Sequence, residues 1–133
     1  MKFVSRKILH IGLPKTATTF LQKKIFPELC NLNKLLFLGK NDNYVNQLNK
    51  KIFHLKYSIE YGFDSKKIDI PNNYLISHEG LIGEDPESWE NSSDKIKNSL
   101  GEDLDILIIL RKPSEFMLSM YLESCISKGF FIN

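Results

Sequence analysis

Cysteine is scarce in this chain of 133 residues, which contains only Cys30 and Cys125. Both lie in segments with a helical pattern, and their spacing is not that of metal ligands. So few cysteines exclude a small scaffold held together by several disulfides. We therefore expect two buried, reduced thiols and no metal site.

The sequence also lacks long apolar runs and a large excess of charge. No run reaches the roughly 20 residues that a helix needs to cross a bilayer, and no signal-peptide segment precedes Gly12. We therefore expect a soluble, cytoplasmic protein with no membrane partner. Basic and acidic residues number 18 and 16, so nucleic acid is not an expected partner. The basic residues that matter should surround a small anionic ligand.

Apolar runs of strand length recur along the chain and alternate with helical patterns. They occur at residues 7–12, 34–38, 74–77 and 105–110. With 42% hydrophobic residues the chain can bury a core, and its length suits one domain. The alternation predicts an α/β fold of three layers, with a mostly parallel sheet flanked by helices.

The first two helical patterns follow the first two strands. One begins at about Ala17, and Pro27 is expected to end or kink it. The second covers residues 43–57. Each supplies an apolar stripe that could cover a face of the sheet.

Two more helical regions follow the third and fourth strands. A short helical turn is predicted at Asp85-Pro86, and a separate helix should be capped by Ser92 or Ser93 and end at Gly101. Pro113 is expected at the first position of the last helix.

A turn that contains a lysine lies between the first strand and the first helix. It reads Pro14-Lys15-Thr16-Ala17-Thr18-Thr19. Backbone N–H groups and the dipole at a helix N-terminus attract anions, and the lysine and the threonine hydroxyls add donors. The turn lacks the second glycine of a Walker A loop. It therefore predicts a phosphate-like ligand in a different kind of loop.

Three predicted strands end in candidate site residues, which are Lys15, Glu79 and Arg111. In parallel sheets ligands bind at the carboxyl ends of the strands. We therefore expect these three residues to lie at one edge of the sheet.

Two motifs resemble those of the sulfotransferases that use 3′-phosphoadenosine 5′-phosphosulfate (PAPS). The turn resembles their 5′-phosphosulfate loop, P-K-T/S-G-T-T, except at Ala17. The stretch from Ile106 resembles their 3′-phosphate motif, an apolar strand followed by R-x-P-x-x-x-x-x-S-x-Y, here with Arg111, Ser119 and Tyr121. The resemblance implies a P-loop NTPase-like fold. Because family members are typically about twice this long, it also implies that residues 1–133 are the N-terminal, donor-binding part of one such domain.

The resemblance also implies roles for the motif residues. Lys15 would stabilise the leaving oxygen, and the turn from Pro14 to Thr19, with the hydroxyls of Thr16, Thr18 and Thr19, would hold the 5′-phosphosulfate without a metal. Ala17 is expected in the first helical turn, where alanine costs nothing. Arg111 and Ser119 would bind the 3′-phosphate.

Each of these two residues has a structural alternative. Arg111 could form a surface ion pair with Glu115, and Ser119 could bond to its own helix backbone. Tyr121 is expected to be a packing residue.

The base that accepts the acceptor's proton is expected after the third strand. Ser77-His78-Glu79 resembles an S-x-E stretch of bacterial relatives. Neighbouring strand residues point to opposite faces, so only Glu79 or His78 should face the site, and Glu79 is preferred. His10 is expected to be a packed core residue.

The predicted function is transfer of a sulfuryl group from PAPS to a hydroxyl or amine of a small molecule or carbohydrate. Two alternatives stay open: a nucleotide-binding remnant without turnover, and a kinase-like phosphotransferase, against which the missing Walker A lysine argues. The apolar stretch 129–133 is a candidate surface for a homodimer.

Overall fold

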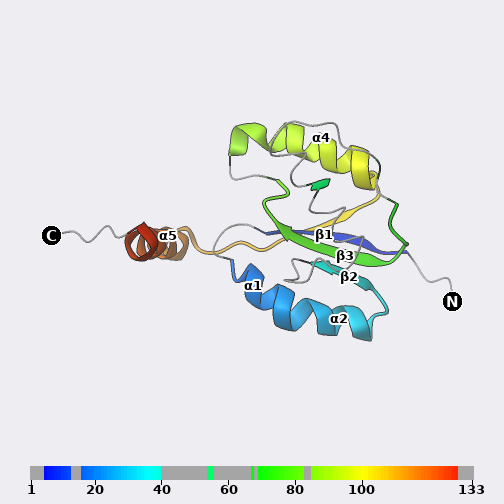
Figure 1. Ribbon diagram of the computed structural model, residues 1–133, viewed down its shortest axis with the longest axis horizontal. Coiled ribbons are helices and arrows are strands. Elements are labelled where there is room, and N and C mark those ends of the chain that lie inside the picture. The colour runs from blue at the N-terminus through cyan, green and yellow to red at the C-terminus, as the bar shows by residue number, and fades with distance from the viewer. Residues whose placement is uncertain are drawn as a thin grey trace.

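The computed structural model describes residues 5–12, 16–39, 54–55, 67, 69–82 and 85–128. Within these ranges four strands form one parallel sheet in the order β2-β3-β1-β4 (Figure 1). The strands are β1 (Lys7–Gly12), β2 (Leu36–Gly39), β3 (Tyr74–Glu79) and β4 (Asp105–Ile108). The protein therefore has the expected α/β fold. The second predicted helix, 43–57, lies almost wholly outside the described residues.

The predicted strands agree with the observed ones within two residues at either end. β1 has the predicted bounds. β2 begins later than predicted because Lys34 has a positive φ of 54° and turns the chain. β3 runs on to Glu79, which pairs with Gly12. β4 stops at Ile108, since β1 ends one residue beyond Ile11, the partner of Ile108.

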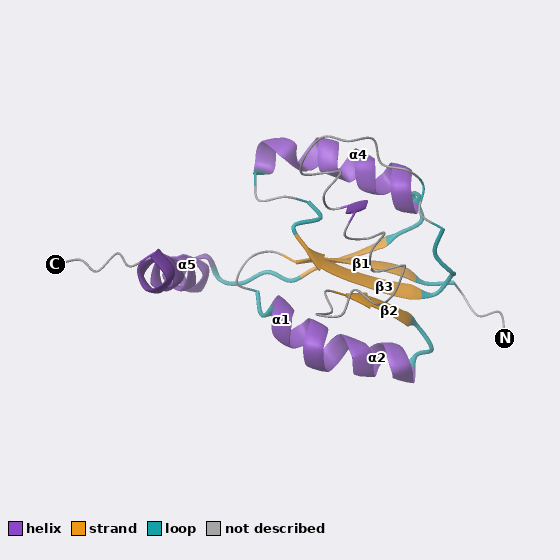
Figure 2. Ribbon diagram, in the orientation of Figure 1, coloured by secondary structure: helices purple, strands orange, loops and turns teal. Residues whose placement is uncertain are grey.

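Helices cover both faces of the sheet, which gives three layers (Figure 2). One face is covered by a continuous helical segment formed by α1 (Thr18–Phe20), the π-helical η1 (Leu21–Ile25) and α2 (Phe26–Leu32). The other face is covered by α4 (Trp89–Leu100). Strand side chains alternate between two buried clusters, since Leu9 packs on the α4 side and Ile8 on the α2 side.

Pro27 does not end the first helix. It lies at the start of α2, directly after the π-helical turn η1. A proline has no N–H to donate to the carbonyl four residues earlier, and a π-turn widens the helix at this point. The predicted disruption is therefore a local change of helix type.

The predicted helical turn at Asp85-Pro86 is confirmed, but the helix that follows is not a separate one. The Asp85 side chain accepts from the Glu87 N–H at 3.1 Å and caps the short 3-10 helix η2 (Pro86–Ser88), which leads directly into α4. The predicted caps Ser92 and Ser93 lie inside α4, and Ser92 is buried. Gly101 ends α4 as predicted, with φ of 94° and its N–H donating to the Lys97 carbonyl at 2.8 Å.

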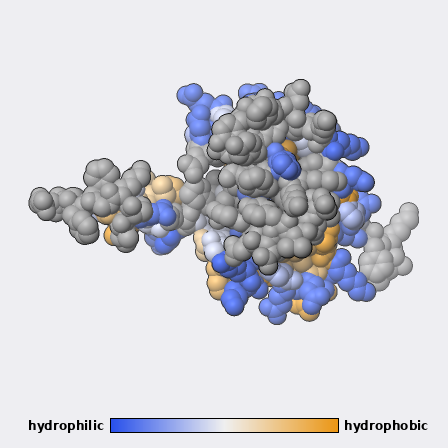
Figure 3. All heavy atoms as spheres, in the orientation of Figure 1, coloured by the Kyte–Doolittle hydropathy of each residue, from blue (hydrophilic) through white to orange (hydrophobic). Residues whose placement is uncertain are grey.

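The last helix, α5 (Pro113–Lys128), begins at Pro113 as predicted. Figure 1 shows that α5 stands apart from the sheet and from the other helices. Apolar side chains are exposed over α5 and over part of the α1–α2 segment (Figure 3). Among the described elements, none covers β4 at the edge of the sheet.

The two cysteines differ in their surroundings, and neither forms a disulfide. Cys30 is buried in α2, and burial raises the pKa of its thiol, which keeps it protonated. Cys125 is only half-buried in α5, so the prediction of two buried thiols is wrong for this residue. None of the helices in the described ranges is both long enough and apolar enough to span a bilayer.

Candidate anion site at the carboxyl edge of the sheet

The candidate site lies where β1 and β3 end side by side. His10, Ile11 and Gly12 pair in register with Ser77, His78 and Glu79. Two of the three predicted strand ends therefore meet at one edge of the sheet, as the sequence predicts. Pro14, Lys15 and the Glu79 side chain lie outside the described residues.

Thr16 and Thr18 form a buried hydroxyl pair just after this edge. Their Oγ1 atoms are 3.2 Å apart, at hydrogen-bond distance, and both residues are buried. Thr19 is exposed on the first turn of the helix. The turn thus holds two threonine hydroxyls in a fixed arrangement at the start of the helix.

Ala17 lies between these threonines in the left-handed region, with φ of 59° and ψ of 23°. The expectation that it lies in the first helical turn is wrong, because the helix begins at Thr18 and Ala17 is its N-cap residue. Ala17 provides no side-chain oxygen for the N–H groups of the first turn, which a serine or aspartate would cap. Its conformation is one that glycine adopts without cost, and glycine is the residue that the resembled motif has here.

We expect Ala17→Gly to stabilise the protein by about 1 kcal/mol, because the left-handed conformation costs an alanine about 1–2 kcal/mol and glycine loses part of this gain to chain entropy. Urea unfolding would measure the gain. Lys34→Gly is the matched comparison. It makes the same kind of change at another residue with a positive φ, of 54°, in the turn before β2 and away from the candidate site. Ala17→Val should lower stability instead. A loss of stability in Ala17→Gly would contradict the strained geometry.

A buried polar network joins this helix to both strands of the site. The Gln22 side-chain amide donates to the Ser77 carbonyl at 3.1 Å and to the Ser77 hydroxyl at 3.0 Å. The same hydroxyl is 2.8 Å from His10 Nδ1. His10 is fully buried as predicted, and its ring meets the Phe26 ring edge to face at 4.9 Å. Buried polar groups that hydrogen-bond one another favour one arrangement, so the bonds among Gln22, Ser77 and His10 Nδ1 hold the helix against β1 and β3.

The sequence pattern assigns no role to Gln22, and to Ser77 only a place in the S-x-E stretch. An apolar-periodicity search passes over polar residues, although Gln22 follows Thr18 by one helical turn and could be expected on the same side. The position of Gln22 just after the lysine-containing turn is the feature of the sequence that points to it.

His78 lies on the other side of the sheet from this network. It is buried, and it lies on the same face of β3 as Tyr74 and Ile76, which belong to the core beneath α4. Ser77, by contrast, meets Gln22 on the side of the α1–α2 segment. The structure therefore separates His78 from Thr16 and Thr18, and Glu79 remains the candidate base.

Arg111 and Ser119 follow β4. Arg111 forms an exposed ion pair with Glu115, with 3.4 Å between Nε and Oε2, which is the alternative that the sequence offers. Such an exposed pair contributes at most about 1 kcal/mol, so it can be exchanged for a phosphate. Ser119 is half-buried on α5, the helix that stands apart from the sheet.

Tyr121 differs from its prediction as a packing residue, because it is half-exposed on α5. A hydrogen bond with Cys125, one turn further along, raises the pKa of its phenol. In the described part of the chain, no group of three or more His, Cys, Asp or Glu side chains could hold a metal ion.

Comparisons with known proteins leave the family unassigned. No protein-family model matches the sequence, and neither does any curated protein. One solved structure, titled "Crystal structure of APE1195", aligns with a TM-score of 0.49 and 12% sequence identity, over 96% of this chain and 77% of that chain. The likeness is too low to bear on function.

Proposed function

We propose that this chain binds PAPS through the edge formed by β1, β3 and β4, and that it transfers the sulfuryl group to a hydroxyl or amine acceptor. One observation carries the proposal. The turn after β1 combines a left-handed Ala17, a buried pair of threonine hydroxyls and a helix N-terminus without a side-chain cap. This combination suits the phosphosulfate end of the donor, because N–H groups and hydroxyls converge there.

The strand register supports a second contact with the same nucleotide. β1 and β4 are neighbours, and Ile11 pairs with Ile108. Arg111 follows Ile108 by three residues, so it leaves the sheet at the edge from which the lysine-containing turn also leaves. Its guanidinium matches a phosphate in shape and charge, and we assign it to the 3′-phosphate together with Ser119.

The proposed reaction is an in-line displacement at sulfur. The acceptor oxygen or nitrogen forms a bond to sulfur while the bond from sulfur to the bridging phosphate oxygen breaks. The leaving nucleotide gains negative charge, which Lys15 neutralises, and the acceptor loses a proton, which Glu79 takes. The sulfuryl group carries less charge than a phosphoryl group, so a lysine and backbone amides suffice and we propose no metal.

The donor site can be tested without knowing the acceptor. We expect calorimetric titration with adenosine 3′,5′-bisphosphate to give a dissociation constant on the order of micromolar. Arg111→Ala should weaken binding by about 10- to 100-fold, because hydrogen bonds to charged groups contribute about 1.5–3 kcal/mol. The matched control is Arg6→Ala, which removes the same charge at the opposite, N-terminal edge of the sheet, where the Arg6 carbonyl accepts from the Tyr74 N–H.

Four outcomes would contradict the proposal. A folded chain that does not bind the nucleotide would remove the donor site. Equal losses of affinity for adenosine 3′,5′-bisphosphate in Arg111→Ala and Arg6→Ala would indicate a nonspecific charge effect. Competition by ATP that depends on Mg²⁺ would favour the kinase-like alternative. Binding without turnover against sugar and phenol acceptors would favour a nucleotide-binding remnant.

A further inference from the structure

β4 has an open edge. It pairs with β1 on one side, and within the described ranges no strand lies on its other side. All four of its residues are exposed, and three of them are apolar. Soluble proteins usually protect such an edge with charges, proline, a bulge or a covering element, because its free N–H and C=O groups can pair with another chain.

In the part of the chain that the structure describes, both faces of β4 are also only partly covered. The register places Ile106 and Ile108 beside Leu9 and Ile11, on the α4 side of the sheet, yet each of the two isoleucines is 50% exposed. A hollow of about 430 Å³ opens there between α4, β1 and β4. Leu107, on the other side of the sheet, is exposed too. β4 therefore has the apolar composition of an interior strand at an uncovered edge.

The charges that flank β4 have opposite signs at its two ends. Glu102 and Asp103 precede the strand, and Arg111 and Lys112 follow it. A second copy running antiparallel along the same edge would bring each acidic end to the basic end of the other copy. A copy running parallel would set like charges side by side and would not close into a dimer.

We propose that two copies of this chain pair through β4 as an antiparallel, two-fold symmetric dimer in the register that centres on Leu107. Directly opposed residues in an antiparallel pair point to the same face of the sheet. The two-fold axis must therefore pass between the two copies of one residue, which then lies opposite itself. The centre on Leu107 sets Glu102 opposite Lys112, Leu104 opposite Leu110 and Ile106 opposite Ile108. It also sets Asp103 opposite Arg111, whose guanidinium has five N–H donors and so can contact the partner's carboxylate as well as a phosphate. One pair, Asp105 with Ile109, is not complementary.

The two neighbouring registers are less complementary. A centre on Ile106 sets Glu102 opposite Leu110 and Asp103 opposite Ile109, so both acidic residues face apolar ones. A centre on Ile108 sets Leu104 opposite Lys112. It forms one kind of ion pair, Asp105 with Arg111, where the centre on Leu107 forms two. The pattern of charge around β4 therefore favours the centre on Leu107.

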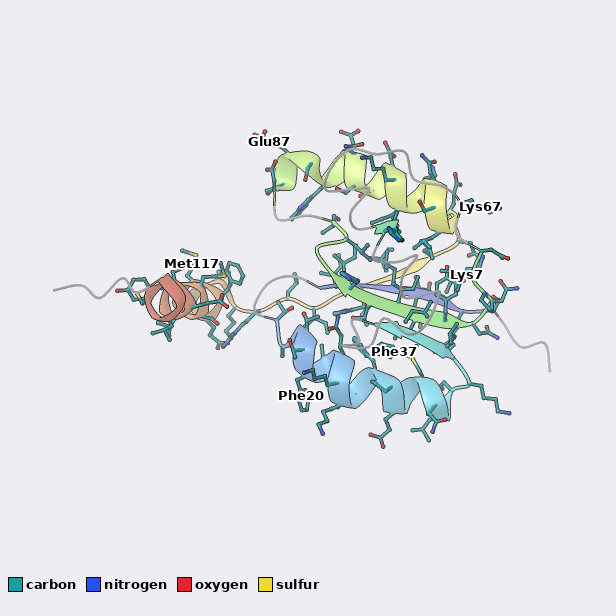
Figure 4. The ribbon with its side chains drawn as sticks, viewed as in Figure 1. Lys7, Phe20, Phe37, Lys67, Glu87 and Met117 are labelled. Carbon is teal, nitrogen blue, oxygen red and sulfur yellow. The ribbon has the colours of Figure 1, made fainter. Side chains whose placement is uncertain are left out.

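The position of α5 agrees with this arrangement. α5 leads away from the C-terminal end of β4, and Figure 4 shows its Met117 far from the chain's own sheet. In the antiparallel dimer that end lies beside the N-terminal end of the partner's β4, where Gly101, Glu102 and Leu104 border the hollow under α4. The exposed apolar side chains of α5 are Met117, Leu118, Tyr121 and Leu122. The dimer brings them towards a surface that they could cover.

The register is tested by cysteine cross-linking in a Cys125→Ser background. Leu107→Cys should form a covalent dimer under mild oxidation, because directly opposed residues lie within the Cα separation of a disulfide, roughly 4.4–6.8 Å. Ile106→Cys and Ile108→Cys should not cross-link alone, and a mixture of the two should. Efficient cross-linking of Ile108→Cys alone would overturn the register.

The association itself is tested by sedimentation over a range of protein concentrations, with circular dichroism as the check on folding. Lys112→Glu and Glu102→Lys should each raise the dimer dissociation constant by about tenfold, since each sets like charges opposite one another at two symmetric positions. The double variant should restore dimerisation. Glu102 also binds Lys97 at 3.0 Å, so Lys97→Ala is the control for loss of that exposed pair.

Two results would overturn the proposal. A chain that stays monomeric at every concentration would leave β4 to a different occupant. A dimer that is insensitive to the Leu107, Lys112 and Glu102 variants would place the interface elsewhere.

Discussion

Lys15→Ala is expected to lower the rate of sulfuryl transfer by about 10²- to 10³-fold, the range observed when one donor to a developing negative charge is removed. The leaving nucleotide gains charge on its bridging oxygen as the bond to sulfur breaks. We assign Lys15 to that oxygen because it is the cation of the turn that joins β1 to the buried Thr16–Thr18 pair. The measurement is single-turnover transfer from PAPS.

The controls for this prediction separate charge from stability. Lys24→Ala removes the same charge from an exposed position of the same helical segment, so its rate should stay within about twofold of the original, as expected for a surface site. The free energy of unfolding of Lys15→Ala, measured in urea, should equal that of the unmodified chain. If Lys15→Ala turned over at a near-normal rate, the assignment to the leaving oxygen would be wrong.

The parts of the fold that depend on local chemistry could be predicted from the sequence. β1 is a short apolar run that ends at Gly12, and α5 begins at a proline. The end of β1 and the start of α5 therefore follow from strand and helix rules. The meeting of the β1 and β3 ends could also be anticipated, because parallel strands bring their carboxyl ends to one edge. These signals need no knowledge of the rest of the molecule.

Ala17 and Ser92 were mispredicted because tertiary context outweighs residue preference. Alanine favours helices, but here the turn needs a left-handed residue between Thr16 and Thr18. Serine favours caps, but Ser92 is buried inside α4, which Asp85 and η2 already start. Neither outcome can be deduced from the residue alone.

β4 illustrates a different gap between sequence and structure. Its apolar run indicates a strand to be covered on both faces, and the strand forms as predicted. The pattern does not say which residues provide the cover, and in the structure Ile106 and Ile108 stay half-exposed. The burial of a strand is a property of its neighbours, so the sequence of the strand predicts the need for cover and leaves the covering element unspecified.

Glu79→Gln is expected to lower transfer by about 10²- to 10⁴-fold while leaving the affinity for adenosine 3′,5′-bisphosphate unchanged. Glutamine keeps the shape of the side chain and removes its ability to take the acceptor's proton. His78→Gln is the matched variant, and it should transfer at close to the original rate, because His78 lies on the α4 side of the sheet.

The two variants together decide the assignment of the base. His78 is buried under α4, so His78→Gln is expected to cost stability, and rates should be compared at a temperature where both proteins are folded. A large loss in His78→Gln with unchanged nucleotide binding, together with normal turnover in Glu79→Gln, would move the role of base to the histidine. With His78 as the base, the acceptor would have to approach β3 from the α4 side of the sheet.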